Sequence, residues 1–352
     1  MTPMMKNLIQ TLGAAAIALL PAATMAQTAA QGADTLAAVR GRGHLLCGVA
    51  GDLPGFSAAG PDQSMRGLDA DYCRAVAAAV FGNAQAVRFV PQSSVETGIA
   101  ALGSGAVDIL ARNATATFGR DTAGNVQPVG VLYYDGQGLL ARGNAGVNSL
   151  TDLAGKKICV GTGGGLQAPA ILERLARERN ITFTQVPAAS SAAAFDAFLA
   201  GQCDVVTGDR SALAARRAVS LPAPDAAVLL PETISREPLS PMVREGDARW
   251  RQIADWVLQA LLVAEELGVN STNLAQSVQV DDPEIRLLLG VDSATAAQLG
   301  LPAEWAVHAL SAVGNYGEMF ERNLGTASGI GLDRGLNDLW RRGGLHFPLP
   351  LR

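Results

Sequence analysis

The sequence predicts an α/β protein built from two similar lobes. Strand-like and helix-like segments alternate along residues 44–111 and again along 157–207, an order typical of βαβ units around a parallel sheet. The two stretches also resemble each other, because 101–109 and 197–205 each end a helix at glycine and begin a strand at aspartate. From about residue 246 the chain is mainly helical. We therefore expect two α/β lobes and a helical C-terminal part.

Composition narrows the class of protein. The 352 residues are 49% hydrophobic and 17% charged, which suits buried cores rather than disorder. The net charge is −5 and no long basic block occurs, so we expect no nucleic-acid partner.

The first 26 residues predict a signal peptide. Lys6 gives a short basic start, and residues 11–23 form an apolar run that is too short to span a membrane. The small Ala26 suits cleavage before Gln27. We therefore expect an exported protein, cleaved after about Ala26.

In the first block, each element follows from its hydrophobic pattern. Strands are expected over 44–49, 86–90 and 106–111, and helices over 68–81 and 94–103. The helix over 68–81 carries apolar residues at helical spacing.

The second block repeats this order before the helical part begins. Strands are expected over 157–160, 181–186 and 203–207, and helices over 166–179 and 190–200. Gly201 ends the last of these helices. Further helices are expected over 282–289, 302–322 and 333–341.

The four cysteines predict disulfides, because the protein is expected to be exported. They are Cys47, Cys73, Cys159 and Cys203. Of the three pairings that four cysteines allow, we favour Cys47–Cys73 and Cys159–Cys203, since each pair lies within one block. Four buried free thiols are the alternative. A zinc site is less expected, because there is no CxxC motif and the three histidines are scattered.

Sequence signatures of enzymes are mostly absent. The chain has no GxSxG, no HExxH and no GxxxxGK[ST] motif. We therefore predict no catalytic residue, no metal and no cofactor.

Three features instead suit the binding of a zwitterion. The glycine run 161–165 precedes a helix, so its backbone N–H groups can bind a carboxylate. Arg120 follows the polar run 112–117 and can pair with a carboxylate. Asp209 has the matching place in the second block and can pair with an ammonium group. The alternatives are a plain turn, a solvated surface side chain and a helix cap.

Longer motifs carry a family resemblance. They include GLDADYCRAVAAAVFG (67–82), VDILARNAT (107–115), RDT (120–122), YYDGQG (133–138), CDVVTGD (203–209), LPETISREPLSPMVREGD (230–247) and VGNYGEMFERNLG (313–325). With these motifs the chain resembles the general L-amino acid-binding proteins of ABC importers, over nearly its whole mature length. The resemblance implies a two-lobed type II periplasmic binding protein with a central hinge, a helical C-terminal extension and no catalysis.

The resemblance also implies how the chain is divided. After the signal peptide (1–26), lobe 1 begins with 33–138, lobe 2 spans 139–240, and 241–352 returns to lobe 1 and adds the extension. The chain would cross between the lobes near residues 137–141 and 238–242. Such a protein is a periplasmic monomer without a cofactor. It binds an L-amino acid between its lobes and delivers it to the permease subunits in the inner membrane.

By position, the resemblance assigns a carboxylate site. Arg120 would bind the α-carboxylate of the ligand. Thr115 and the backbone of Asn113 would assist from lobe 1. The backbone of Gly164 and Gly165 would complete the site from lobe 2.

The remaining assignments concern the rest of the ligand. Asp209 would pair with the α-ammonium group. The side-chain pocket would be lined by Leu53, Phe56 and Ser94. This chain departs from its relatives at Ala116, where they have a tryptophan.

Two other functions are alternatives on the same fold. One is a periplasmic enzyme of the dehydratase type, with Glu96 as its acid. The other is a ligand-sensing partner of a membrane receptor. Leu166 and the glycines before it replace hydroxyl residues of the relatives, which bears on which ligands are bound.

Overall fold

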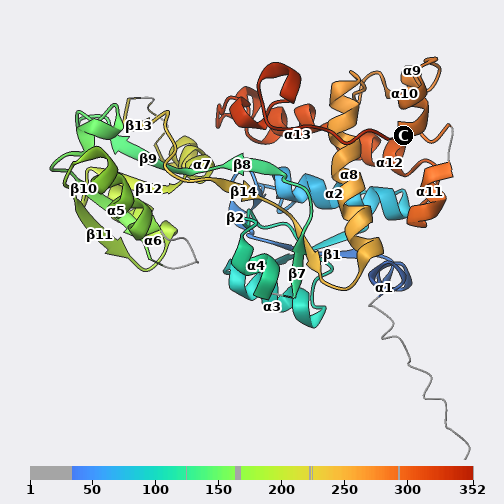
Figure 1. Cartoon of the computed structure of the whole chain (residues 1–352), viewed down its shortest axis with the longest axis horizontal. Helices are drawn as coiled ribbons and strands as arrows, with labels where there is room; N and C mark the ends of the chain where they lie inside the picture. Colours follow the sequence, from blue (N-terminus) through green and yellow to red (C-terminus); the bar gives the residue numbers. More distant parts are fainter. Residues whose placement is uncertain are drawn as a thin grey trace, which may run out of the picture. The chain divides into compact units, whose positions relative to one another are not determined.

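The computed structural model describes residues 34–123, 125–162, 168–221, 223, 225–291 and 294–351 (Figure 1). The predicted signal peptide lies outside these residues, as do Gly164, Gly165 and Leu166 of the predicted site. The described residues form two five-stranded sheets, one for each predicted lobe. In this part of the chain, no helix is both long and apolar enough to cross a membrane.

The first sheet has the strand order β5-β1-β6-β15-β7. Its strands are β1 (Leu45–Val49), β5 (Val87–Pro91), β6 (Ile109–Leu110), β7 (Val126–Pro128) and β15 (Met242–Arg244). β1 pairs in parallel with β5 and β6, whereas β15 runs antiparallel to β6 and β7. Because β15 comes from a distant part of the sequence, the chain leaves this lobe and later returns to it.

The helices of this lobe include one that is buried almost all round. They are α1 (Thr35–Arg42), α2 (Leu68–Phe81), α3 (Val95–Ser104) and α4 (Phe118–Ala123). The run AVAAAV lets α2 pack closely on several sides, because its side chains are small. α2 begins after Gly67, which has a φ of +127° and whose Cβ, if present, would lie 2.1 Å from the carbonyl oxygen of Phe56. Glycine is therefore required at this position.

The second sheet has the strand order β11-β10-β12-β9-β13. Its strands are β9 (Gln137–Arg142), β10 (Lys157–Gly161), β11 (Thr184–Ala188), β12 (Val205–Asp209) and β13 (Ala227–Leu229). β10 pairs in parallel with β11 and β12, and β9 runs antiparallel to β12 and β13. Its helices are η1 (Leu150–Leu153), α5 (Ala168–Arg179), α6 (Ser191–Leu199) and α7 (Arg210–Ser220).

Two further strands join these sheets along the chain. β8 (Tyr133–Asp135) and β14 (Glu237–Leu239) pair antiparallel, with Glu237 opposite Asp135. β8 leads directly into β9 of the second sheet, and β14 leads into β15 of the first sheet. A separate three-stranded sheet comprises β2 (Asp52–Leu53), β3 (Ser57–Ala59) and β4 (Met65–Arg66). β14 overlaps the crossing predicted near 238–242, whereas β8 ends before the crossing predicted near 137–141, a segment that belongs to β9 of the second sheet.

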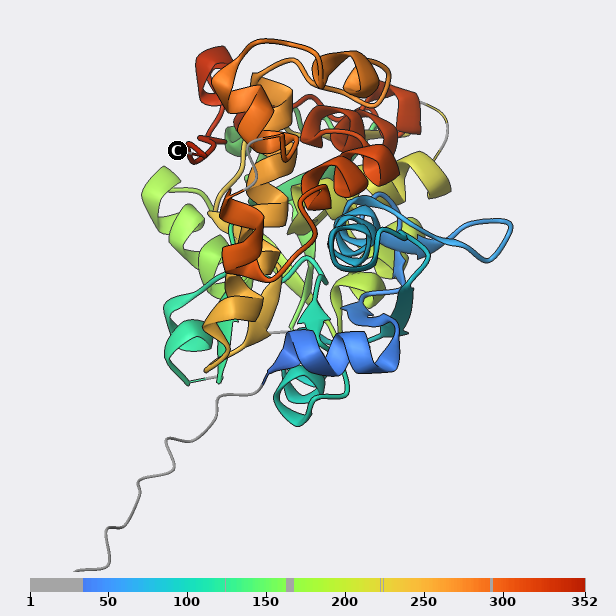
Figure 2. The same ribbon diagram turned by 90° about the vertical axis from the view of Figure 1, so that its right-hand side faces the viewer.

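The C-terminal part is helical, as predicted. It comprises α8 (Ala248–Glu266), α9 (Leu274–Ser277), α10 (Pro283–Leu288), α11 (Ala294–Leu299), α12 (Trp305–Val313), α13 (Tyr316–Asn323), η2 (Thr326–Ser328), η3 (Gly335–Asn337) and η4 (Trp340–Arg342). α12 and α13 pack against both α2 and α8, as the orange and red helices of Figure 2 show. The extension thereby enlarges the core of the first lobe.

Two predicted helices in this part are wrong. The helix expected over 302–322 is interrupted, because Gly314 has a φ of +72° and Asn315 caps a new helix. The Oδ1 atom of Asn315 accepts from the N–H of Glu318 at 3.0 Å, and the Glu318 carboxylate accepts from the N–H of Asn315 at 2.8 Å. The helix expected over 333–341 is replaced by two short 3₁₀ turns. There Asn337 bonds through its side chain to both backbone groups of Tyr134, and this tertiary contact outweighs helix propensity.

Three predicted strands begin later than expected, because helix ends extend toward them; one is the strand expected over 203–207, since β12 begins only at Val205. The N–H groups of Ala106 and Val107 bond to the carbonyl of Ala101 at the end of α3, so β6 begins only at Ile109. The N–H of Ile181 likewise bonds back to α5, and β11 begins at Thr184.

The favoured disulfide pairing is confirmed. Cys47 is bonded to Cys73 and Cys159 to Cys203, and no described cysteine is free. The first bond joins β1 to α2, and the second joins β10 to the turn before β12. Each lobe therefore has its own covalent link between a strand and a following element.

Candidate functional site

The polar segment after β6 is held against β14. The N–H of Ala116 donates to the carbonyl of Pro238 at 2.9 Å, and the N–H of Ser240 donates to the carbonyl of Ala114 at 2.9 Å. Thr115 lies between them and forms a bridge with Leu239. The backbone of residues 114–116 is thus fixed beside the strand that returns to the first lobe.

Arg120 lies on α4 and is fixed by this same segment. Its Nη1 donates to the carbonyl of Thr115 at 2.8 Å, and its Nη2 lies 3.9 Å from Oε1 of Glu96. The Arg120 side chain is 18% exposed, whereas that of Glu96 is 57% exposed. A guanidinium has five N–H donors, so donors remain for a ligand.

Both other donors predicted in lobe 1 already have acceptors in the protein. The hydroxyl of Thr115 donates to Oε2 of Glu237 at 2.8 Å, and both residues are buried. The N–H of Asn113 donates to Oδ2 of Asp69 at 3.1 Å, where Asn113 has a φ of +42°. Neither group has a second proton to offer a carboxylate, so their predicted role in binding one has no support in these contacts.

Asp69 is the buried acid that holds this turn of the backbone. Burial raises its pKa from 3.8 to about 7, while the Asn113 N–H and the charge of Arg112 act in the opposite direction. The folded protein therefore binds a proton here more tightly than the unfolded chain. The free energy of unfolding should fall as the pH rises from about 4 to about 7, and this contribution should not change further above that.

The Asp69→Asn variant tests this linkage. Asparagine can still accept the Asn113 N–H through its oxygen, but it carries no charge to bury. We expect the stability of the variant relative to wild type to increase by more than about 1 kcal/mol between pH 4.5 and pH 8. Urea unfolding at the two pH values measures it. A stability difference that is the same at both pH values would contradict the assignment.

Asp209 ends β12 and lies among other carboxyl groups. Its Oδ1 atom is buried and has no hydrogen-bond partner, although the residue as a whole is partly exposed. Burial raises its pKa well above the usual range, as do the charges of Asp135 and Glu237, while Arg120 opposes the rise. A cation placed here would bond to an oxygen that otherwise has no partner.

The predicted pocket residues have structural contacts of their own. Leu53 and Phe56 are 7% and 1% exposed, and the Phe56 ring meets the Tyr133 ring edge-on at 5.4 Å. Ser94 caps α3, since its Oγ accepts from the N–H of Thr97 at 3.1 Å. The lining of a side-chain pocket by these three residues stays a prediction.

Three charged residues near the site were not predicted from the sequence. Arg112 donates through Nε to the carbonyl of Gln92 at 2.9 Å, and burial lowers its pKa. Asp135 and Glu237 face each other across the β8–β14 pair. Both acids lie in motifs that carry the family resemblance, YYDGQG and LPETISREPLSPMVREGD. An acid in each of these two motifs was therefore the sequence signal that could have identified them.

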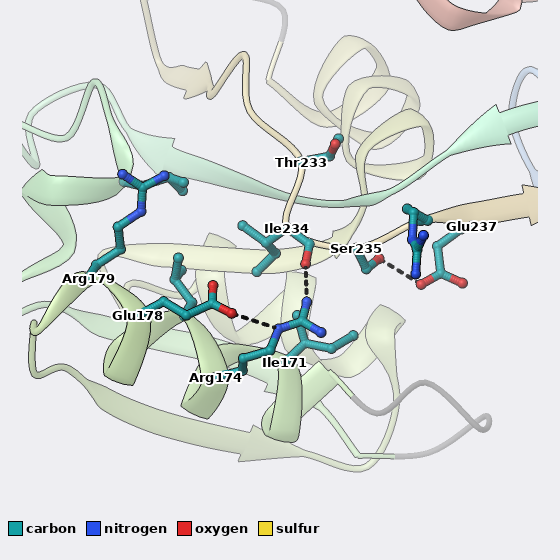
Figure 3. A pocket seen from close by; sticks show the side chains of 11 residues that line it. Ile171, Arg174, Glu178, Arg179, Thr233, Ile234, Ser235 and Glu237 are labelled. Atoms are coloured by element: carbon teal, nitrogen blue, oxygen red, sulfur yellow. Dashed lines mark hydrogen bonds and ion pairs between the residues drawn. The ribbon is translucent and has the colours of Figure 1, made fainter. Parts of the chain in front are cut away.

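A pocket of about 610 Å³ lies elsewhere, along α5 and residues 233–237 (Figure 3). Three arginines line it, namely Arg174, Arg179 and Arg236, and the Nη2 of Arg174 donates to the carbonyl of Ile234 at 2.8 Å. None of the predicted ligand residues that the structure describes lines this pocket. Glu237 does, as does Ser235, whose hydroxyl donates to Glu237 at 2.6 Å, so the pocket adjoins the Thr115 network.

Comparison with known proteins identifies the family. The chain matches the bacterial extracellular solute-binding proteins, family 3, over residues 45–268. This is more than half of its length, and the match ends just after α8. The chain belongs to this family. Its remaining C-terminal helices lie beyond the family match.

Relatives of known name cover almost the whole chain. A glutamate/glutamine/aspartate/asparagine-binding protein of Rhodobacter capsulatus is 44% identical over 324 residues, which is 92% of this chain and 95% of the relative. The general L-amino acid-binding periplasmic protein of Rhizobium johnstonii is 40% identical, over 92% of this chain and 94% of the relative. These relatives are named as binding proteins rather than as enzymes.

A solved structure confirms the two-lobed periplasmic binding protein fold together with the extension. It is an ABC transporter periplasmic binding protein from Brucella ovis with glutathione bound. It has a TM-score of 0.85 and 41% identity, and the match covers 91% of this chain and all of the other. An ancestral arginine-binding protein, with 24% identity and a TM-score of 0.51, matches only 64% of this chain.

Proposed function

We propose that this protein is the substrate-binding component of an ABC importer and that its ligand is an L-amino acid. The single observation that carries the proposal is that a guanidinium with free donors and an acid with a buried, unpartnered oxygen influence each other's charge across the site. Arg120 is held by the Thr115 carbonyl with donors to spare, and Asp209 has a buried oxygen without a partner. The whole-chain relatives named as amino-acid-binding proteins support the same ligand class.

The charges assign the two ends of the ligand. Arg120 binds the α-carboxylate, because a guanidinium offers two parallel donors to it. Asp209 binds the α-ammonium group. The family resemblance adds the backbone N–H groups of Gly164 and Gly165, which lie outside the described residues, as further donors to the carboxylate. The lobes, divided just before β9 and near 240/241, close on the ligand by hinge motion.

The relatives and the N-terminal sequence support a proposal for the cellular setting. The protein acts in the periplasm after removal of residues 1–26 and passes its ligand to the permease subunits of the transporter. It works as a monomer and needs no cofactor. The family and the name of the Rhizobium johnstonii relative support the periplasmic location.

An enzyme of the dehydratase type is less well supported. Its proposed acid, Glu96, is more than half exposed and lies 3.9 Å from Arg120. An acid catalyst has to be held within hydrogen-bond reach of its substrate, whereas more than half of the Glu96 side chain is open to solvent. Glu96 instead serves as a counter-charge to Arg120, and a ligand carboxylate would take its place beside the guanidinium.

Isothermal titration tests the proposal. The exported protein is unfolded and refolded to remove any bound ligand, and it is then titrated with each of the twenty L-amino acids. Glutathione is included, because it carries a free α-amino-acid end and is bound in the Brucella ovis relative. We expect micromolar or tighter binding of at least one of the twenty L-amino acids, equivalent to about −8 kcal/mol. No binding of any of them would refute the proposal.

A further inference from the structure

The pocket along α5, here called the α5 pocket, has one face of that helix as a wall. Counted from Ile171, which also lines it, the lining residues three, four, seven and eight positions later share one side of a helix, namely Arg174, Leu175, Glu178 and Arg179. Another wall is formed by residues 233–237, which lead into β14. The volume of about 610 Å³ suits a small-molecule site.

Hydrogen bonds fix the wall formed by residues 233–237. The N–H of Ile234 donates to the carbonyl of Gln137 at 2.8 Å, and the hydroxyl of Ser235 accepts from the N–H of Gln137 at 2.9 Å. The Nη2 of Arg174 donates to the carbonyl of Ile234 at 2.8 Å, which joins the two walls directly (Figure 3). Because protein contacts hold both walls, the pocket is formed before any ligand binds, which lowers the cost of binding.

Two arginines that line the pocket have all their donors free for a ligand. Arg179 and Arg236 are exposed, and neither makes a hydrogen bond or an ion pair with any described residue. Arg179 ends α5, where a cation also complements the helix dipole. Arg236 comes from the other wall and has no such role. Unpaired guanidinium groups on two walls of one cavity therefore indicate an anionic ligand.

The two acids that line the pocket are either bound by hydroxyl groups or exposed to solvent. Glu237 is buried, and its carboxylate accepts from the hydroxyls of Ser235 at 2.6 Å and Thr115 at 2.8 Å. Glu178 lies 3.6 Å from Arg174, and 61% of its side chain is exposed. Such an exposed ion pair contributes little stability, so Glu178 can move aside when a stronger anion binds.

We propose that the α5 pocket is a second binding site, for a small anion with at least two phosphate or carboxylate groups, held by Arg174, Arg179 and Arg236. More than one anionic group is needed because the arginines lie on two walls, and each guanidinium can offer parallel donors to one group. The site lies apart from the proposed amino-acid site, so both ligands bind at the same time. The inference does not depend on which ligand the amino-acid site takes.

Isothermal titration of the refolded, exported protein at low salt tests the site with two probes. Inorganic pyrophosphate carries two phosphate groups, and tricarballylate carries three carboxylates on a short carbon chain. We expect at least one probe to bind in a ratio of one to one with a Kd below about 1 mM, and acetate to bind at least about tenfold more weakly. The probe that binds more tightly shows whether phosphate or carboxylate is preferred. Added salt should weaken binding, because it screens exposed charges.

Four variants at exposed positions separate this site from general attraction to positive charge. Arg179→Ala and Arg236→Ala should each weaken binding of the probe at least about tenfold, because each removes charge-assisted bonds. Arg177→Ala is the matched control, since Arg177 is an exposed arginine of α5 that does not line the pocket, and its affinity should equal that of wild type. Glu178→Gln removes the competing carboxylate and should tighten binding about threefold.

A repeat titration with the preferred L-amino acid in excess separates the two sites. One probe molecule should still bind, and loss of probe binding under these conditions would place the probe in the amino-acid site and overturn the inference. No binding of either probe by wild type would overturn it as well, as would equal weakening in Arg177→Ala and Arg236→Ala. Weakening confined to Arg179→Ala and Arg236→Ala, with tighter binding in Glu178→Gln, supports the site.

Discussion

Replacing Arg120 by alanine weakens binding of the preferred L-amino acid at least a hundredfold. The Thr115 carbonyl holds this guanidinium, and its side chain is only 18% exposed. In the variant, the ligand carboxylate loses its charge-assisted bonds and stays partly desolvated. Breaking one side of a buried ion pair costs about 3–5 kcal/mol, and a hundredfold change in Kd is about 2.7 kcal/mol. Isothermal titration of both proteins measures the change.

Two further variants show whether geometry or charge is responsible. Arg120→Lys keeps the charge but not the parallel donors, so its affinity for the ligand should lie between that of wild type and that of Arg120→Ala. Arg179→Ala removes an exposed arginine of the separate pocket and should bind like wild type. Unchanged affinity in Arg120→Ala would remove Arg120 from the site.

Loss of the disulfide in the second lobe produces the largest expected change in stability. Cys159 and Cys203 close a stretch with a sequence separation of 44. Constraint of the unfolded chain by such a loop contributes about 4 kcal/mol, and the Cys47–Cys73 loop, with a separation of 26, about 3.5 kcal/mol. We expect Cys159→Ala/Cys203→Ala to lower the free energy of unfolding of the second lobe by that order.

Urea unfolding under oxidising conditions measures this effect. The matched variant Cys47→Ala/Cys73→Ala should destabilise the first lobe by a slightly smaller amount. Added reductant should lower the stability of wild type more than that of Cys159→Ala/Cys203→Ala, because the variant has only the Cys47–Cys73 bond left to lose. A decrease below about 1 kcal/mol in Cys159→Ala/Cys203→Ala would mean that the bond does not constrain the unfolded chain as assumed.

Much of the fold could be predicted because local signals agree with tertiary contacts. The helix over 68–81 has the bounds predicted for it, since glycines flank it and its apolar residues suit burial on several sides. Both disulfides followed from their places in the two blocks. The prediction of one continuous helix over 302–322 was wrong, because the positive φ of Gly314 and the cap at Asn315 outweigh the helical periodicity.

The site could be predicted less completely, because its contacts join distant residues. Thr115 and Glu237 are 122 positions apart, and no local pattern indicates that their side chains meet. The N–H of Asn113 is likewise taken by Asp69, 44 positions away. Family resemblance assigned Arg120 and Asp209 by position, but the direction of a hydroxyl proton depends on neighbours that only the folded chain brings together.

A crystal structure of the protein with its tightest-binding L-amino acid tests the central claim most directly. The account predicts the ligand carboxylate within about 3 Å of the Arg120 guanidinium, and the ligand ammonium within about 3 Å of the Asp209 carboxylate. A ligand held with its carboxylate at another cation, such as Arg174 in the α5 pocket, or with its two ends reversed, would contradict it.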